Sequence, residues 1–260
     1  GHIGVFKEDH DGAMARFIGE ADVIFCMDFN QINRLDRVTD TVTANTTAVR
    51  VLIDHHLHPP VDGYAVQFSD THACSTSYIV YQLLEALAGT DAIDQAMAES
   101  LYVGIMTDTG NFSFSSLTSD LFRAVAVLID KGVNVPYVNS SVYNNFSEGR
   151  MRLLGYMLND KMVTDYEFGV AYVSLTEEEM RRFDFIQGDS EGFVNYPLSI
   201  RGIRMSAMFI QTKHSIRVSL RSRGEVDVNV FARRYFDGGG HRNAAGGKSY
   251  VPMNETLENF

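Results

Sequence analysis

Asp54, His55 and His56 stand at the end of a short, mainly apolar run, residues 49–53. A bounded run of this kind is typical of a buried strand, and chemistry in open α/β sheets collects where strands end at their carboxyl edge. One carboxylate and two imidazoles at such an edge are ligand types that Zn²⁺ and Mn²⁺ prefer. Alone, the triplet is equally compatible with two histidines on a surface loop, so other parts of the chain must decide.

Two further carboxylates follow apolar segments. The stretch 21–27 predicts a second strand, and Asp28 ends it. Asp108 lies in a Thr-Asp-Thr-Gly sequence directly after a predicted helix over residues 91–106. Two strands that each end in an acidic side chain predict a parallel sheet with a functional edge.

Three hydroxyl residues, Ser75, Thr76 and Ser77, begin a predicted amphipathic helix over residues 75–87. Such residues are typical helix N-caps. Alternatively, hydroxyls and amides at a helix N-terminus hold an anion such as phosphate. Both interpretations remain open at this stage, and Ser75 and Ser77 are candidate substrate-binding residues.

A glycine-rich stretch near the C-terminal end is the second unusual feature. Gly238, Gly239 and Gly240 precede His241, and a further glycine pair follows at 246–247. Glycines let a ligand approach the backbone closely and expose N–H groups to anions. We predict a loop over residues 237–247. A tight turn alone would not explain why a histidine and an arginine stand between two glycine clusters.

The predicted elements divide the chain into two α/β domains. The first combines the two apolar strands with flanking helices in a parallel-sheet arrangement. The pattern changes after a helix over residues 147–159 to alternating segments typical of strands, at 160–175, 204–212 and 215–222, followed by a helix at 228–235. We place the boundary on that helix and assign residues 1–150 to the first domain and 151–260 to a smaller second domain.

Charge is spread unevenly over the 260 residues, whose net charge is −11. Residues 1–160 hold 20 acidic and 9 basic side chains, whereas residues 161–260 hold 13 of each. An acidic first domain is a poor general surface for nucleic acid, but it suits a site with several carboxylate metal ligands.

Compartment signals all agree with one another. Cys26 and Cys74 form no CxxC pair or disulfide framework, which fits a reducing compartment. No apolar run approaches the ~18 residues of a membrane span, and no signal peptide opens the sequence. We therefore expect a cytoplasmic protein with no membrane association.

Together these motifs resemble the DHH phosphoesterases that carry a DHHA1 domain, the superfamily of the RecJ nucleases. The residues that carry the resemblance are 26–28, 54–56, 107–110 and 238–247, in that order. The segments 191–200 and 219–224 are most similar to the nanoRNase/pAp-phosphatase branch. That similarity implies metal-dependent hydrolysis of short oligoribonucleotides and of 3′-phosphoadenosine 5′-phosphate (pAp). It also implies two Mn²⁺ ions in an intact site, with Mg²⁺ or Co²⁺ as alternatives.

The resemblance implies a role for each residue of the first domain. Asp28 would bridge two metal ions, and His55 and Asp108 would bind one of them. Asp54 would orient a ligand, and His56 would meet the scissile phosphate or the leaving group.

In the second domain, the resemblance implies that Arg221, His241 and the glycines 238–240 hold the terminal nucleotide and its phosphate. One family motif is not found. The family opens with a strand ending in His-x-x-x-Asp-x-Asp, and residues 9–13 resemble this only superficially, because they lie where a helix should precede Asp28. We expect the first βα unit to be missing from this chain, which puts a complete two-metal site in question.

Two other functions remain open from the sequence alone. One is hydrolysis of inorganic phosphate chains, as by an exopolyphosphatase or inorganic pyrophosphatase. The other is a non-catalytic nucleotide-binding module that has lost its first motif. The sequence leaves a homodimer open and implies no protein partner.

Overall fold

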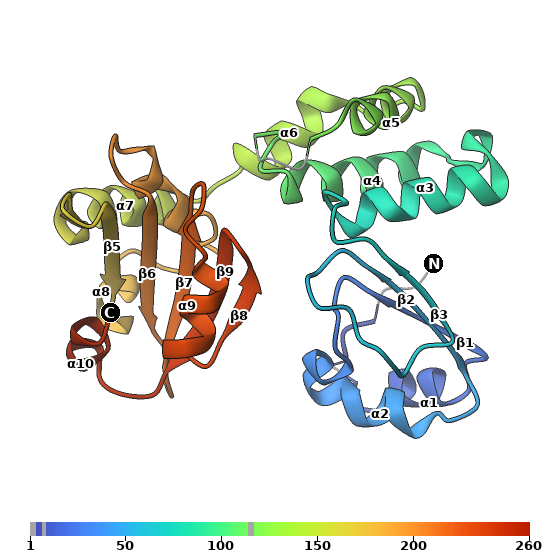
Figure 1. The fold of residues 1–260 in the computed structure, drawn as a ribbon, viewed down its shortest axis with the longest axis horizontal. Helices are drawn as coiled ribbons and strands as arrows, with labels where there is room; N and C mark the ends of the chain where they lie inside the picture. Colours follow the sequence, from blue (N-terminus) through green and yellow to red (C-terminus); the bar gives the residue numbers. More distant parts are fainter. Residues whose placement is uncertain (1–3, 7–8, 114–116) are drawn as a thin grey trace. The chain divides into compact units, whose positions relative to one another are not determined.

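The computed structural model describes residues 4–6, 9–113 and 117–260. The chain forms two compact units, Gly1–Val142 and Tyr143–Phe260. Each contains one β-sheet with helices packed beside it (Figure 1). The sheet of the first unit is parallel and that of the second is mixed. The α/β class and the parallel sheet predicted for the first domain are therefore confirmed.

The sheet of the N-terminal unit has the order β1-β2-β3. Its strands are β1 (Val23–Met27), β2 (Val49–Asp54) and β3 (Val66–Ser69). Because all three are parallel, their carboxyl ends meet at one edge of the sheet. The sequence predicted β1 and β2 but not β3, because β3 has only four residues and two of them are polar.

The other elements of the N-terminal unit are helical. They are α1 (Ala13–Gly19), α2 (Thr39–Ala44), α3 (Thr76–Ala88), α4 (Gln95–Asp108), α5 (Ser119–Asp130) and α6 (Val135–Tyr143), with 3₁₀ turns at Ile32–Val38 and Thr90–Ala92. The predicted helix over 91–106 begins later, because the Asp94 side chain accepts the Met97 N–H and caps α4 at that point.

The sheet of the C-terminal unit has six strands in the order β4-β5-β6-β7-β9-β8. They are β4 (Val163–Asp165), β5 (Val170–Leu175), β6 (Met205–Gln211), β7 (Ile216–Ser222), β8 (Gly239–His241) and β9 (Ala244–Ser249). The helical segments are α7 (Glu148–Tyr156), a π-helical turn (Met157–Lys161), α8 (Glu177–Arg181), a 3₁₀ segment (Phe193–Ser199), α9 (Val228–Tyr235) and α10 (Met253–Glu258).

The glycine-rich stretch is a hairpin rather than the loop that we predicted. Gly239 pairs with Gly246 and His241 pairs with Ala244 across β8 and β9. The backbones approach so closely that a Cβ atom at Gly238 would lie 2.0 Å from the Gly246 carbonyl oxygen. Glycine is therefore needed here for close strand contact, and the sequence signal for a flexible loop was misleading.

The second unit begins eight residues before the predicted boundary of 150/151. Helix α7 explains the difference, because its buried residues Leu153 and Leu154 pack with Val173 and Met208 of the C-terminal sheet. A boundary within α7 would separate this helix from the core that it covers.

Glu179 joins several elements of the C-terminal unit through one carboxylate. It accepts hydrogen bonds from Lys161 Nζ (2.6 Å) and the Tyr156 hydroxyl (2.7 Å), and it forms a capping box with Thr176 at the start of α8. Burial alone would raise the pKa of Glu179, but these hydrogen bonds outweigh it and lower the pKa to about 2, from an ordinary value of 4.5.

Replacing Glu179 with glutamine should lower the free energy of unfolding of the C-terminal unit by about 1–3 kcal/mol at pH 7. The folded-state pKa is depressed, so the contribution is complete above about pH 4.5 and declines as the pH falls toward 2. Urea unfolding of the whole chain at several pH values measures this, with Glu178→Gln as a control on the same helix. A Glu179→Gln defect that stays constant down to pH 2.5 would contradict the assignment.

Candidate metal centre

Three ligand-type side chains meet at the carboxyl edge of the parallel sheet. Asp28 follows β1, His55 follows β2, and Asp108 is the last residue of α4. His55 Nε2 lies 3.7 Å from Asp28 Oδ1 and 3.7 Å from Asp108 Oδ2. One potential ligand atom from each residue lies within 4.8 Å of the other two. The structure therefore brings together the three residues that the sequence predicted as metal ligands.

Asp28 is held at this edge by both its backbone and its side chain. Its N–H donates to the Ile53 carbonyl oxygen at 3.1 Å, and its φ of 65° lies in the left-handed region, which non-glycine residues rarely adopt. Its Oδ1 accepts a hydrogen bond from the Thr76 hydroxyl at 2.9 Å. Strained backbone of this kind is concentrated at functional sites.

The ring orientation of His55 suits a metal ligand. His55 Nδ1 lies 3.3 Å from the Ala73 carbonyl oxygen, which can only accept, so Nδ1 carries the proton. Nε2 is then the ring nitrogen that lies near the carboxylates of Asp28 and Asp108. Metal-binding histidines are commonly fixed by such a hydrogen bond to a carbonyl group. Two carboxylate oxygens and one imidazole nitrogen gathered around one point are a donor set that fits a divalent ion.

The surroundings of Asp108 raise the pKa of its carboxyl group. Burial raises the pKa of this carboxyl group, and the nearby charge of Asp28 raises it further, while His55 acts in the opposite direction. Asp108 also ends α4, where the negative end of the helix dipole disfavours an anion. A cation at this point would relieve all of these unfavourable terms.

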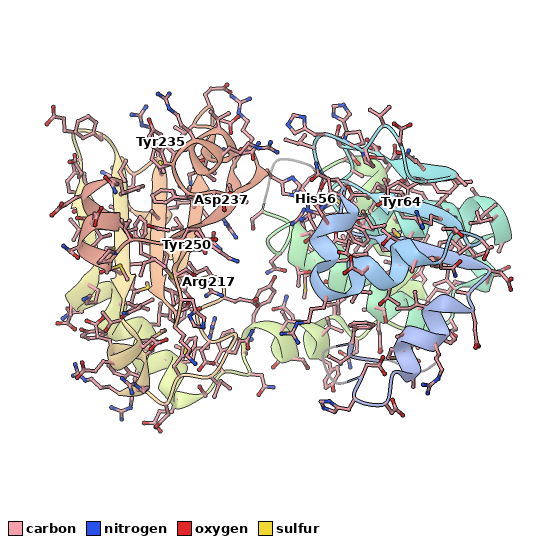
Figure 2. The ribbon with its side chains drawn as sticks, turned by 90° about the horizontal axis from the view of Figure 1, so that it is seen from below. His56, Tyr64, Arg217, Tyr235, Asp237 and Tyr250 are labelled. Carbon is pink, nitrogen blue, oxygen red and sulfur yellow. The ribbon has the colours of Figure 1, made fainter. Side chains whose placement is uncertain are left out.

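A second group shares Asp28 with the first and contains Asp54 and His56. Asp54 is fully buried and accepts hydrogen bonds from His56 Nδ1 (2.7 Å) and the His56 backbone N–H (3.2 Å). Burial raises the pKa of Asp54, but the hydrogen bonds and charge of His56 outweigh it, so the pKa is lowered overall. His56 is labelled within the N-terminal unit in Figure 2. Membership of both groups fits the bridging role predicted for Asp28.

The hydroxyl residues at the start of α3 have different hydrogen-bond partners. Ser75 is fully buried and its oxygen accepts the Tyr78 N–H, so it is the N-cap. Thr76 donates to Asp28, a contact that the sequence analysis did not assign. No pattern in the sequence distinguishes the middle residue of Ser-Thr-Ser as the one that faces β1. The predicted roles of Ser75 and Ser77 in substrate binding stay predictions.

A cavity of about 360 Å³ opens beside the candidate ligands. Asp28, Asp108, Thr76 and Ser77 contribute to its lining. Helices α3 and α4 approach closely here: a Cβ atom at Gly104 would lie only 2.0 Å from the Ser77 hydroxyl oxygen. Glycine at 104 therefore shapes the wall of this cavity.

Residues 9–13, which superficially resemble the missing first motif, have a local structural role. The two carboxylate oxygens of Asp9 accept the N–H groups of Met14 and Ala15, both at 2.9 Å, in the first turn of α1. Neither Asp9 nor Asp11 belongs to the ligand groups found among the described residues.

The residues predicted to bind substrate in the second domain lie on neighbouring strands. Arg221 on β7 pairs with Ala244 on β9, which in turn pairs with His241 on β8. Arg221 Nη1 donates to the Leu220 carbonyl oxygen at 2.9 Å, and burial lowers the pKa of its guanidinium group. The Gly240 N–H donates to the side chain of Asn229 on α9 at 3.0 Å, which holds the hairpin against that helix.

Comparisons with known proteins identify the family. The model of the DHH family N-terminal domain matches residues 3–105, and that of the DHHA1 domain matches residues 166–260. The bifunctional oligoribonuclease and PAP phosphatase NrnA of Bacillus subtilis (strain 168) is 30% identical over 251 residues, which cover 95% of this chain and 73% of that protein. The chain belongs to the DHH/DHHA1 phosphoesterase family. The resemblance predicted from the motifs is thus confirmed.

Two further relatives support this DHH/DHHA1 assignment. NrnA of Thermus thermophilus is 29% identical over 194 residues, covering 75% of this chain and 56% of that protein. The crystal structure of an exopolyphosphatase-related protein from Bacteroides fragilis superposes with a TM-score of 0.91 at 39% identity. That match covers 96% of this chain and 73% of the other. The chain therefore spans roughly half to three quarters of these relatives.

Within the described residues, the helices are too short or too polar for any of them to traverse a lipid bilayer. Cys26 and Cys74 are both free and buried.

Replacing Thr76 with valine should weaken binding of Mn²⁺ by about 10–100-fold, because an outer hydrogen bond that orients a metal ligand is lost. Thr76→Ser keeps the hydroxyl and should bind within a few-fold of the wild type. Isothermal titration of metal-free protein measures both variants. Equal affinities for the valine and serine variants would show that the hydroxyl does not orient Asp28.

Proposed function

We propose that this protein hydrolyses phosphoester bonds in short oligoribonucleotides and in pAp, with two divalent ions of which Mn²⁺ is the working metal. The names of two NrnA relatives, from Bacillus subtilis and Thermus thermophilus, support this substrate class. We also infer a cytoplasmic location, in keeping with two free, buried cysteines.

The convergence of Asp28, His55 and Asp108 carries the proposal. These residues come from three separate elements, and the Ala73 carbonyl oxygen fixes the His55 tautomer that suits a metal ligand. Two carboxylates and one imidazole around one point are ligands of the kind that hold divalent ions in metal-assisted phosphoester hydrolysis.

Divalent ions at this centre would polarise the phosphate group and lower the pKa of a bound water molecule. Asp28, which belongs to both groups of ligand-type side chains, would be the ligand that the two ions share. Asp54 keeps a proton on His56 Nδ1, so Nε2 is the nitrogen that can act on substrate. When His56 is doubly protonated, its Nε2–H can donate to the leaving-group oxygen, and the buried Asp54 carboxylate stabilises that imidazolium ion.

The C-terminal unit would supply substrate binding in this proposal. Arg221 and His241, with the glycines 238–240, would hold the terminal nucleotide and its phosphate. Arginine suits this task because its guanidinium group can donate two parallel hydrogen bonds to phosphate oxygens. In this division of labour, the N-terminal unit carries the chemistry and the C-terminal unit binds the terminal nucleotide.

An exopolyphosphatase activity is the second candidate function. The similarity to the Bacteroides fragilis protein, which is described as exopolyphosphatase-related, favours it. Nucleotide and polyphosphate substrates share the phosphate group that a divalent-metal centre recognises, so only rates can separate them. A non-catalytic nucleotide-binding module is the remaining alternative, and it predicts binding without turnover.

Initial rates on pAp, a pentaribonucleotide and polyphosphate, each with Mn²⁺, test the function. We expect the two nucleotide substrates to be hydrolysed at least about tenfold faster than polyphosphate. Asp28→Ala and His55→Ala should fall to near background while the fold survives, because each removes a ligand from a partly open edge rather than a core contact.

Asp62→Ala, which removes an exposed loop carboxylate, is the matched control and should keep wild-type rates. Faster turnover of polyphosphate would replace the proposal with the second candidate. Wild-type turnover by either ligand variant at limiting Mn²⁺ would place the chemistry elsewhere.

A further inference from the structure

One face of β7 carries a row of polar side chains. Arg217, Ser219 and Arg221 alternate along the strand with residues that are buried on its other face. The neighbouring strand β9 places Lys248 opposite Arg217 and Gly246 opposite Ser219. Figure 2 labels Arg217 within this unit. The row therefore combines cations at intervals with a stretch of bare backbone.

In the described part of the chain, the cations of this row have no acidic partners. Arg217 and Lys248 are directly opposite across the strands, an arrangement of like charges that destabilises a sheet. Among the described residues, neither of them forms an ion pair with a carboxylate, and the largely buried Arg221 also has none. Exposed cations that are close together and have no acidic partner can bind an anion.

The side chain of Arg217 is held in place by a hydrogen bond, unlike that of an ordinary surface arginine. Its Nη2 donates to the hydroxyl oxygen of Ser190 at 2.8 Å, and Ser190 is 1% exposed. Arg150 fixes the loop that carries Ser190, because its guanidinium group is buried and donates to the carbonyl groups of Gly188, Asp189 and Glu191. A guanidinium group that is held before a ligand arrives loses less side-chain entropy on binding.

Glycine backbone forms the sheet surface beside Ser219, between the cations. Gly246 pairs with Ser219 on one side and with Gly239 of β8 on the other, so no side chain projects from β9 or β8 at this level. Glycines let a sugar or base approach the sheet closely. Along β7, the row thus presents Arg217, then a polar surface of Ser219 and glycine backbone, and then Arg221.

We propose that Arg217 and Lys248 form a subsite for an internal phosphate of an oligoribonucleotide whose terminal nucleotide lies at Arg221. Four residues of extended strand separate the backbones of Arg217 and Arg221 by about 13 Å. A ligand with a single nucleotide, such as pAp, occupies only the Arg221 end, whereas a chain of several nucleotides reaches both. This inference rests on the proposed function and deepens it by assigning oligonucleotides, rather than pAp alone, as the substrates that the C-terminal unit distinguishes.

Binding of a fluorescent pentaribonucleotide to the metal-free whole chain in EDTA tests the subsite without turnover. The double variant Arg217→Ala/Lys248→Ala should bind at least about tenfold more weakly than the wild type. Its plot of log affinity against log salt concentration should lose a slope of about 0.7 for each phosphate contact removed. Affinity for pAp, titrated in parallel, should change less than about twofold.

The matched control is Lys213→Ala/Arg234→Ala, which removes the same two charge types at exposed positions outside the row. We expect it to bind the pentanucleotide with wild-type affinity and salt slope. The single variant Lys248→Ala, at an exposed side chain, keeps the test sharp if the double variant does not fold.

The subsite would be overturned by wild-type binding in the double variant, by equal losses in the control, or by an equal loss of pAp affinity. Failure of the wild type to bind the pentanucleotide would overturn it as well. A wild type that binds the pentanucleotide with the predicted salt slope but hydrolyses no nucleotide with Mn²⁺ would support the subsite and contradict the proposed function. The subsite and the proposed function can therefore be contradicted independently of each other.

Discussion

Convergence of two carboxylates and one imidazole at one edge of the parallel sheet is the constraint on which the candidate metal centre depends. Asp28, His55 and Asp108 converge because two parallel strands and one helix end at the same place. Without a cation, this arrangement brings two carboxylates together beside the negative end of a helix dipole. Burial raises the pKa of Asp108, and the charge of Asp28 raises it further. The fold accepts strain at Asp28 and a buried charge at Asp54 to maintain the geometry, which fits a site selected for chemistry.

Much of the fold follows from local patterns in the sequence. The apolar runs before Asp28 and Asp54 predicted β1 and β2, and the hydroxyl residues 75–77 predicted the capped start of α3. The helix predicted at 228–235 is α9 (Val228–Tyr235). These elements could be predicted because capping and apolar periodicity act over a few neighbouring residues.

The features that the sequence did not predict depend on contacts between distant residues. The hairpin of β8 and β9 forms because glycine backbones pack closely across strands, yet the same glycines indicate a loop when read locally. Thr76 acquires its role only because α3 begins beside the end of β1, 48 residues earlier in the chain. The boundary before α7 is set by packing of Leu153 on a sheet that follows in sequence. Tertiary packing decided each case.

The ligand centre itself is the claim that most needs a direct measurement. Anomalous diffraction from crystals of the protein grown with Mn²⁺, recorded on both sides of the manganese absorption edge, locates the ion independently of activity. The account predicts an anomalous peak with His55 Nε2 and one carboxylate oxygen each of Asp28 and Asp108 at about 2.0–2.5 Å. A fully occupied manganese ion that contacts none of these three residues would contradict it.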